Sequence, residues 1–144
     1  MGYSPWLDAA ERHPDVQIAR CDISPARGAW VEQERVILLD TALDVVGRRC
    51  ALAHELAHVD LYHEPADGWF AGRFERDADR IAAGRLLSDV ERIAEALAVH
   101  PLDPSAVAES LDVSVPVLRR RLRALTDAEK ALIEARLERC DRSC

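Results

Sequence analysis

Two histidines four positions apart, His54 and His58, flank Glu55 in the segment His-Glu-Leu-Ala-His. An α-helix stacks residues i and i+4 on one face, so both imidazoles can bind a single metal ion. A catalytic Zn²⁺ site commonly has three protein ligands and a bound water, whose pKa falls to about 7. We expect Glu55 to accept a proton from that water and to be the catalytic base. The spacing therefore indicates metal-dependent hydrolysis.

A third ligand has to come from another segment. Residues 71–87 are predicted to form a second helix, which carries Glu75 and Asp79 on one face. We expect Glu75 to complete the metal site and Asp79 to accept a hydrogen bond from the far ring nitrogen of a ligating histidine. Asp77 is the alternative ligand, but it lies about 200° around the helix from Glu75. Asp79 has an alternative role as a surface acid that pairs with a neighbouring arginine.

Other side chains close to the first motif also have reactive chemistry. Cys50 lies one helical turn before the motif and could approach the metal as a thiolate, although a cysteine in an apolar helix is more commonly a packing residue. Tyr62 and His63 follow the motif and are candidates for stabilising an oxyanion. Asp60 fits no recognised ligand spacing, so we expect it to be solvated.

The two motifs need helices to position them. We predict a helix over residues 41–61, with a loop over residues 64–69 before the second helix. Trp69 and Phe70 are expected to anchor the core beside that loop, with substrate contact as the alternative. The first helix is indicated by apolar residues at helical spacing, namely Ala42, Val45, Val46, Leu52, Ala53, Leu56, Ala57 and Val59.

The segment before the motif is predicted to form a short helix and then strands. Ser4-Pro5 is a typical helix start, and this helix should end near residue 13. Residues 16–21, 28–32 and 35–39 have strand patterns, and the last two form a predicted hairpin. We expect a small antiparallel three-stranded sheet packed on the motif helix. A free strand edge beside the metal could bind an extended peptide by main-chain hydrogen bonds.

The segment His54-Glu55-Leu56-Ala57-His58, followed by residues 75–87, resembles the ImmA/IrrE family of metallopeptidases. The resemblance implies a small sheet before the motif helix and a substrate that is typically a helix-turn-helix repressor. It also implies the site roles, with His54, His58 and Glu75 as metal ligands and Glu55 as the catalytic residue.

The chain departs from the family pattern at two places. Asp77 stands where the family usually has Glu, and Ser88-Asp89 stands where Met-Pro is common. Neither departure touches an expected ligand. The two histidines and one glutamate suit Zn²⁺ and do not exclude Mn²⁺ or Fe²⁺.

The last third of the chain has a different pattern. Residues 104–125 resemble a helix-turn-helix, and residues 118–142 carry a net charge of +3 against −10 for residues 1–117. The basic helix could contact DNA phosphates, although the overall charge of −7 opposes this. Alternatively, the two helices cap the peptidase core or bind an acidic partner. The arginines of the basic helix are expected to be exposed because they lie off its apolar stripe. They are Arg119, Arg120, Arg121 and Arg123.

Length and composition fit a small cytosolic enzyme, and the predicted elements indicate an α+β fold. The 144 residues, 49% hydrophobic and 31% charged, suffice for one compact core. We expect a zincin-like metallopeptidase domain over residues 1–99 and a helical extension over residues 100–144. No secretory or membrane-spanning segment is predicted, so we expect a cytoplasmic protein. Four cysteines without paired spacing indicate neither a disulfide framework nor a cysteine zinc site.

The predicted function is therefore a zinc-dependent endopeptidase that cleaves a protein substrate at one or a few sites. We expect the substrate to be a helix-turn-helix repressor, whose cleavage relieves repression. The alternative is a DNA-binding or antitoxin-like regulator that retains a non-catalytic metal site.

Overall fold

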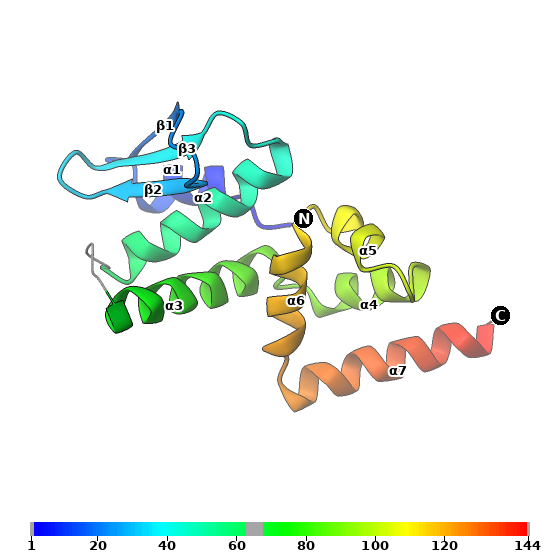
Figure 1. The fold of residues 1–144 in the computed structure, drawn as a ribbon. Helices are drawn as coiled ribbons and strands as arrows, with labels where there is room; N and C mark the ends of the chain where they lie inside the picture. The colour runs from blue at the N-terminus through cyan, green and yellow to red at the C-terminus, as the bar shows by residue number, and fades with distance from the viewer. Residues whose placement is uncertain (1, 63–67, 144) are drawn as a thin grey trace.

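The computed structural model describes residues 2–62 and 68–143, which form an α+β fold as predicted (Figure 1). The sheet lies on one side of α2 and α3 lies on the other, while α4 to α7 gather beyond the end of α3. The elements in chain order are α1 (Pro5–Arg12), β1 (Gln17–Cys21), β2 (Gly28–Val31), β3 (Val36–Asp40), α2 (Val45–Asp60), α3 (Gly68–Leu86), α4 (Val90–Val99), α5 (Pro104–Ser110), α6 (Val115–Arg123) and α7 (Asp127–Ser143).

The sheet has three strands in the order β1-β3-β2. β2 and β3 form the predicted antiparallel hairpin, with Gly28 opposite Leu39. The prediction of an all-antiparallel sheet is wrong for the other pair, because β1 runs parallel to β3 with Ile18 opposite Ile37. β3 occupies the centre because Ile37 and Leu39 are fully buried against α2. Alternating apolar residues indicate strands, but they do not determine which strands are neighbours.

The helix that carries the histidines is buried on two sides. Leu52 and Leu56 of α2 pack in the cluster under the sheet, whereas Ala53 packs in a second cluster with Ala82 of α3. Small side chains at this second interface allow the two helices to approach closely. α2 begins at residue 45, four residues later than predicted, because the Asp44 side chain accepts a hydrogen bond from Gly47 N at 2.7 Å and caps the helix.

The corner between α2 and α3 differs from the sequence expectation. Residues 63–67 lie outside the described ranges, and so does the candidate His63. Trp69 and Phe70 belong to the first turn of α3 and are 63% and 59% exposed, so their prediction as core anchors is wrong. Their rings pack on each other at 5.1 Å between centroids, and the Arg73 guanidinium lies over Trp69. The two aromatic side chains therefore pack against each other at the surface and not in the core.

Asp60 at the end of α2 is not the solvated acid that we predicted. Its carboxylate lies 2.9 Å from Arg12 Nη2, 2.7 Å from His13 Nε2 and 2.6 Å from Arg85 Nη2. Partial burial opposes ionisation of Asp60, but hydrogen bonds from Arg12, His13 and Arg85 lower its pKa to about 2. Asp60 thereby ties α1, α2 and α3 together.

The C-terminal helices share a core with the rest of the chain. One cluster of buried side chains includes Ala53 of α2 and Leu86 of α3, and continues through Ile93, Val107 and Leu118 to α7. The apolar core therefore passes the predicted boundary at residue 99 without a break. None of the helices in the described ranges combines the length and apolar character that crossing a bilayer requires.

Candidate metal centre

His54 and His58 lie one turn apart on the same side of α2. Their Nε2 atoms are 3.1 Å apart, and the His54 ring meets the His58 ring edge-on at 4.8 Å between centroids. Both rings are largely protected from solvent, with side-chain exposures of 18% and 10%. The helix therefore directs two imidazole nitrogens at one point, which is the geometry that i, i+4 spacing produces.

Glu75 of α3 lies next to both histidines and completes the group from the neighbouring helix. Its Oε2 atom is 3.0 Å from His54 Nε2, and its Oε1 atom is 2.9 Å from His58 Nε2. Within the described residues, His54, His58 and Glu75 form the group of side chains that could hold a metal, with their ligand atoms inside 4.8 Å of one another. Zinc lies about 2.0–2.2 Å from nitrogen and oxygen ligands, so atoms around one tetrahedral ion are separated by little more than 3 Å. The donor set and its spacing fit such an ion.

The electrostatics of the group also favour a cation. Burial disfavours the charged form of His54, but hydrogen bonds with Asp79 and Glu75 outweigh it and raise the pKa of His54 to about 10. The hydrogen bond with His54 likewise lowers the pKa of Glu75. Carboxylates on both sides of the imidazole thus stabilise positive charge at this point, which a proton or a metal ion can supply.

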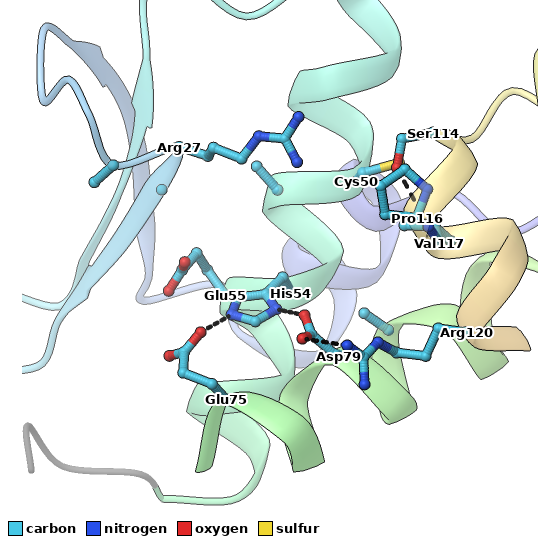
Figure 2. A pocket seen from close by; sticks show the side chains of 14 residues that line it. Arg27, Cys50, His54, Glu55, Glu75, Asp79, Ser114, Pro116, Val117 and Arg120 are labelled. Carbon is cyan, nitrogen blue, oxygen red and sulfur yellow. Dashed lines mark hydrogen bonds and ion pairs between the residues drawn. The ribbon is translucent and has the colours of Figure 1, made fainter. Parts of the chain in front are cut away.

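Asp79 lies behind His54, one turn along α3 from Glu75. Its Oδ1 atom is 2.8 Å from His54 Nδ1, and its Oδ2 atom is 3.3 Å from Arg120 Nη2 (Figure 2). A carboxylate that accepts the Nδ1–H favours the tautomer whose Nε2 lone pair is available to a metal ion held beside Glu75. Asp77, the alternative ligand, instead lies 3.6 Å from Arg80 and does not join the group.

Glu55 points from α2 toward the sheet side of the site (Figure 2). It is only 7% exposed. Burial raises its pKa to about 7, the negative charge of Glu75 adds to the rise, and the charge of His54 opposes it. A carboxyl group with a pKa near neutrality is suited to both accepting and returning a proton. Gly28 lies against its side chain, and a Cβ atom there would come within 3.1 Å of Glu55 Oε1.

A cavity of about 440 Å³ opens beside these residues. Its walls come from the β1–β2 connection, α2, α3 and the start of α6, as Figure 2 shows. Arg27 and the α6 wall were not predicted, because nothing in their local sequence indicates that they approach the motif. The lining residues are Ala26, Arg27, Gly28, Cys50, Ala51, His54, Glu55, Glu75, Asp79, Ala82, Ser114, Pro116, Val117 and Arg120.

A family model described as the IrrE N-terminal-like domain, of the M78 peptidases, matches residues 11–123. The chain belongs to this family. The match confirms the resemblance to ImmA/IrrE metallopeptidases, and it indicates a peptidase that uses a metal. No curated protein matches the chain. The matched region extends from α1 to the end of α6, so it includes every wall of the cavity.

The basic helix of this M78 peptidase does not present a row of exposed arginines. The prediction that Arg121 is exposed is wrong, because it is 8% exposed and its Nε–H donates to the Leu87 carbonyl at 2.8 Å. Its Nη2 atom also lies 2.6 Å from Glu129 Oε2. Arg121 follows the buried Leu118 by three residues and so shares its helix face. Arg119 and Arg123 are exposed, whereas Arg120 contacts Asp79.

Two further candidates of the M78 peptidase have contrasting surroundings. Cys50 is buried in the core cluster with Ala53 and also lines the cavity, but its sulfur is not part of the ligand group within the described residues. Tyr62 is 88% exposed at the end of α2. It is not among the residues that line the cavity.

Proposed function

We propose that the chain is a zinc-dependent endopeptidase, with His54, His58 and Glu75 as metal ligands and Glu55 as catalytic base. The observation that carries this proposal is the convergence of the three ligand atoms beside a buried carboxyl group. Two histidines and a glutamate suit Zn²⁺, while Mn²⁺ and Fe²⁺ accept the same ligands. The family match supports the reaction class.

Each residue of the site has a distinct part in the proposed reaction. His54, His58 and Glu75 would hold a metal ion, which would supply an activated water and a Lewis acid for the scissile carbonyl. Glu55 accepts the proton of the water and then returns it to the departing amine. Asp79 holds His54 in the tautomer whose Nε2 is free to bind. Burial of Glu55 keeps its pKa within the range that this proton transfer needs.

An extended substrate could be held by the edge of the sheet. β2 is an outer strand, and its first residue, Gly28, lines the cavity next to Glu55. The Asp40 N–H donates to the Arg27 carbonyl at 2.8 Å. Because antiparallel pairing alternates, the backbone groups of Gly28 and Trp30 then point away from β3. These groups could bind a peptide backbone and present its carbonyl beside the metal.

The substrate class in this proposal is a helix-turn-helix repressor, cut at one or a few sites in the cytoplasm, so that cleavage relieves repression. This assignment rests on the family resemblance. The cavity of about 440 Å³ matches a short extended segment better than a folded domain. We therefore expect cleavage within a linker or another accessible segment of the repressor.

The decisive experiment compares the wild-type chain with Glu55→Gln, which removes the base and leaves the three ligands. Both proteins are loaded with zinc and incubated with helix-turn-helix repressors from the same source, and the products are identified by mass spectrometry. We expect equal zinc content and cleavage by the wild type alone. Cleavage that survives in Glu55→Gln would contradict the assigned mechanism. A biological activity that survives Glu55→Gln but requires Arg119 would support the DNA-binding alternative.

A further inference from the structure

We propose that Arg120 of α6 is a positioning residue for the metal centre and acts on His54 through Asp79. The inference rests on the proposed function to the extent that His54 is a metal ligand. It assigns a role in the active site to the C-terminal helices, which the predicted division at residue 99 places outside the peptidase domain.

The contacts form a continuous path across three helices. The Asp79 carboxylate uses one oxygen for His54 Nδ1, at 2.8 Å, and the other for Arg120 Nη2, at 3.3 Å. A carboxylate held at both oxygens cannot rotate about its terminal bond without losing one partner. Arg120 therefore restricts the orientation of Asp79, and Asp79 restricts the plane of the imidazole. Figure 2 shows the three side chains in this order beside the cavity.

Arg120 is itself held in place by the residue that follows it. Arg121 is buried and bonds both the Leu87 carbonyl at the end of α3 and Glu129 of α7. Leu118, one turn earlier on the same face, is 1% exposed. These anchors fix α6 against α3, so the Arg120 guanidinium reaches Asp79 from a rigid support.

The Asp79–Arg120 pair is a poor candidate for a purely stabilising contact. The two side chains are 37% and 39% exposed, and ion pairs with that exposure contribute little to folding stability. Metal affinity responds more strongly than folding stability to such a contact, because it depends on the orientation of each ligand. Loss of a partner that contacts a ligand typically changes metal affinity or activity by 10–100-fold. Arg120 acts one contact further out, so we expect a smaller effect of about threefold to tenfold.

The test measures zinc dissociation constants by competition with a chromophoric chelator for Arg120→Gln and Arg120→Ala in the full chain. Arg119→Ala is the matched control, because it removes an exposed arginine one position away on the same helix. We expect about threefold to tenfold weaker zinc binding for both Arg120 variants and no change for the control. Arg120→Lys should restore part of the affinity, because an ammonium group can still bind one Asp79 oxygen.

A double-mutant cycle with Asp79→Ala identifies the path of the effect. If Arg120 acts through Asp79, adding Arg120→Ala to Asp79→Ala causes no further loss of affinity. The absorption spectrum of the cobalt-substituted protein should also change in Arg120→Ala and not in Arg119→Ala. Additive losses, or equal affinities in the Arg119 and Arg120 variants, would overturn the inference. A wild type that binds zinc but cleaves no repressor would refute only the proposed function.

Discussion

Gly28 and Glu55 meet where the edge strand crosses the motif helix. A Cβ atom placed on Gly28 would lie 3.0 Å from Glu55 Cγ and 3.1 Å from Oε1, closer than side chains normally tolerate. The absence of a side chain at residue 28 therefore gives the Glu55 carboxyl group its place beside the cavity.

This relationship predicts a specific defect in Gly28→Ala. The new methyl group should displace the Glu55 carboxylate and lower the rate of peptide cleavage by about 10–100-fold, because proton transfer depends on its position. The zinc content should not change, since the three atoms nearest to the new methyl group all belong to Glu55, which is not a ligand. Gly84→Ala is the control, because nothing lies within 4 Å of a Cβ there. This helix-interior change should preserve activity and stabilise the fold by about 0.5–1 kcal/mol. A normal rate in Gly28→Ala would show that Glu55 tolerates displacement.

Metal content should follow the three converging side chains. We expect about one equivalent of zinc in the wild type and little in His54→Ala or Glu75→Ala, because two remaining ligands bind the ion weakly. Asp77→Asn should retain the metal, since Asp77 pairs with Arg80 outside the site. Elemental analysis of proteins purified without chelator measures this. Equal zinc loss in Asp77→Asn would indicate that Asp77 takes part in binding.

Removal of the metal should lower thermal stability as well as activity. A ligand that binds only the folded chain raises the free energy of unfolding, and chelation abolishes that gain. We expect the melting temperature of the wild type to fall on addition of a chelator and to recover with zinc. Glu75→Ala should show a much smaller response. The same melting temperature with and without chelator in the wild type would mean that this site does not hold the ion.

Cys50 should be dispensable for metal binding. Its sulfur is buried in the core cluster and lies outside the ligand group. Cys50→Ala should therefore retain zinc with an unchanged dissociation constant, while losing some packing. Competition with a chromophoric chelator measures the affinity. A marked loss of affinity, with the fold intact by circular dichroism, would assign the thiolate to the site.

The ion pair that anchors α6 should produce a defined pH dependence of stability. Hydrogen bonds from Arg121 and Thr126 lower the pKa of Glu129 from 4.5 to about 2. Because the folded pKa is depressed, this stabilisation is complete above about pH 5 and is lost as the pH falls through 2. Glu129→Gln should lower the free energy of unfolding by about 1 kcal/mol at neutral pH.

Urea unfolding at about pH 7, 4 and 3 measures this difference. The difference in unfolding free energy between the wild type and Glu129→Gln should narrow as the pH falls, because Glu129 of the unfolded wild-type chain takes up a proton below about pH 4.5 and this favours unfolding. Glu134→Gln is the matched control, since it removes an exposed acid from the same helix. A gap that is constant with pH would assign the effect to lost packing.

Sequence patterns predicted the part of the site that depends on local geometry. The i, i+4 spacing of His54 and His58 determines their shared helix face, and the same rule relates Glu75 to Asp79. Small residues such as Ala53 and Ala82, where the helices pack, allow the two faces to meet. The roles of these side chains in metal binding and catalysis stay predictions.

Several features that sequence patterns missed depend on distant contacts. The Arg120–Asp79 ion pair joins residues 41 positions apart, and the place of β3 at the centre of the sheet follows from its packing on α2. The position of Arg121 off the apolar stripe predicts exposure, but the side chain is buried because it donates to the Leu87 carbonyl, 34 positions earlier in the chain. Hydrophobic periodicity does not report such partners.

The charged lining of the cavity affects whether the metal or the polypeptide binds first. Its carboxylates are Glu55, Glu75 and Asp79, and its guanidinium groups are Arg27 and Arg120. With the acids ionised and His54 protonated, as its raised pKa favours without a metal, these charges sum to zero, and a divalent ion in place of that proton would leave one excess positive charge. The metal would thus make the field that an approaching polypeptide meets more positive, so acidic segments would be attracted more strongly to the loaded form.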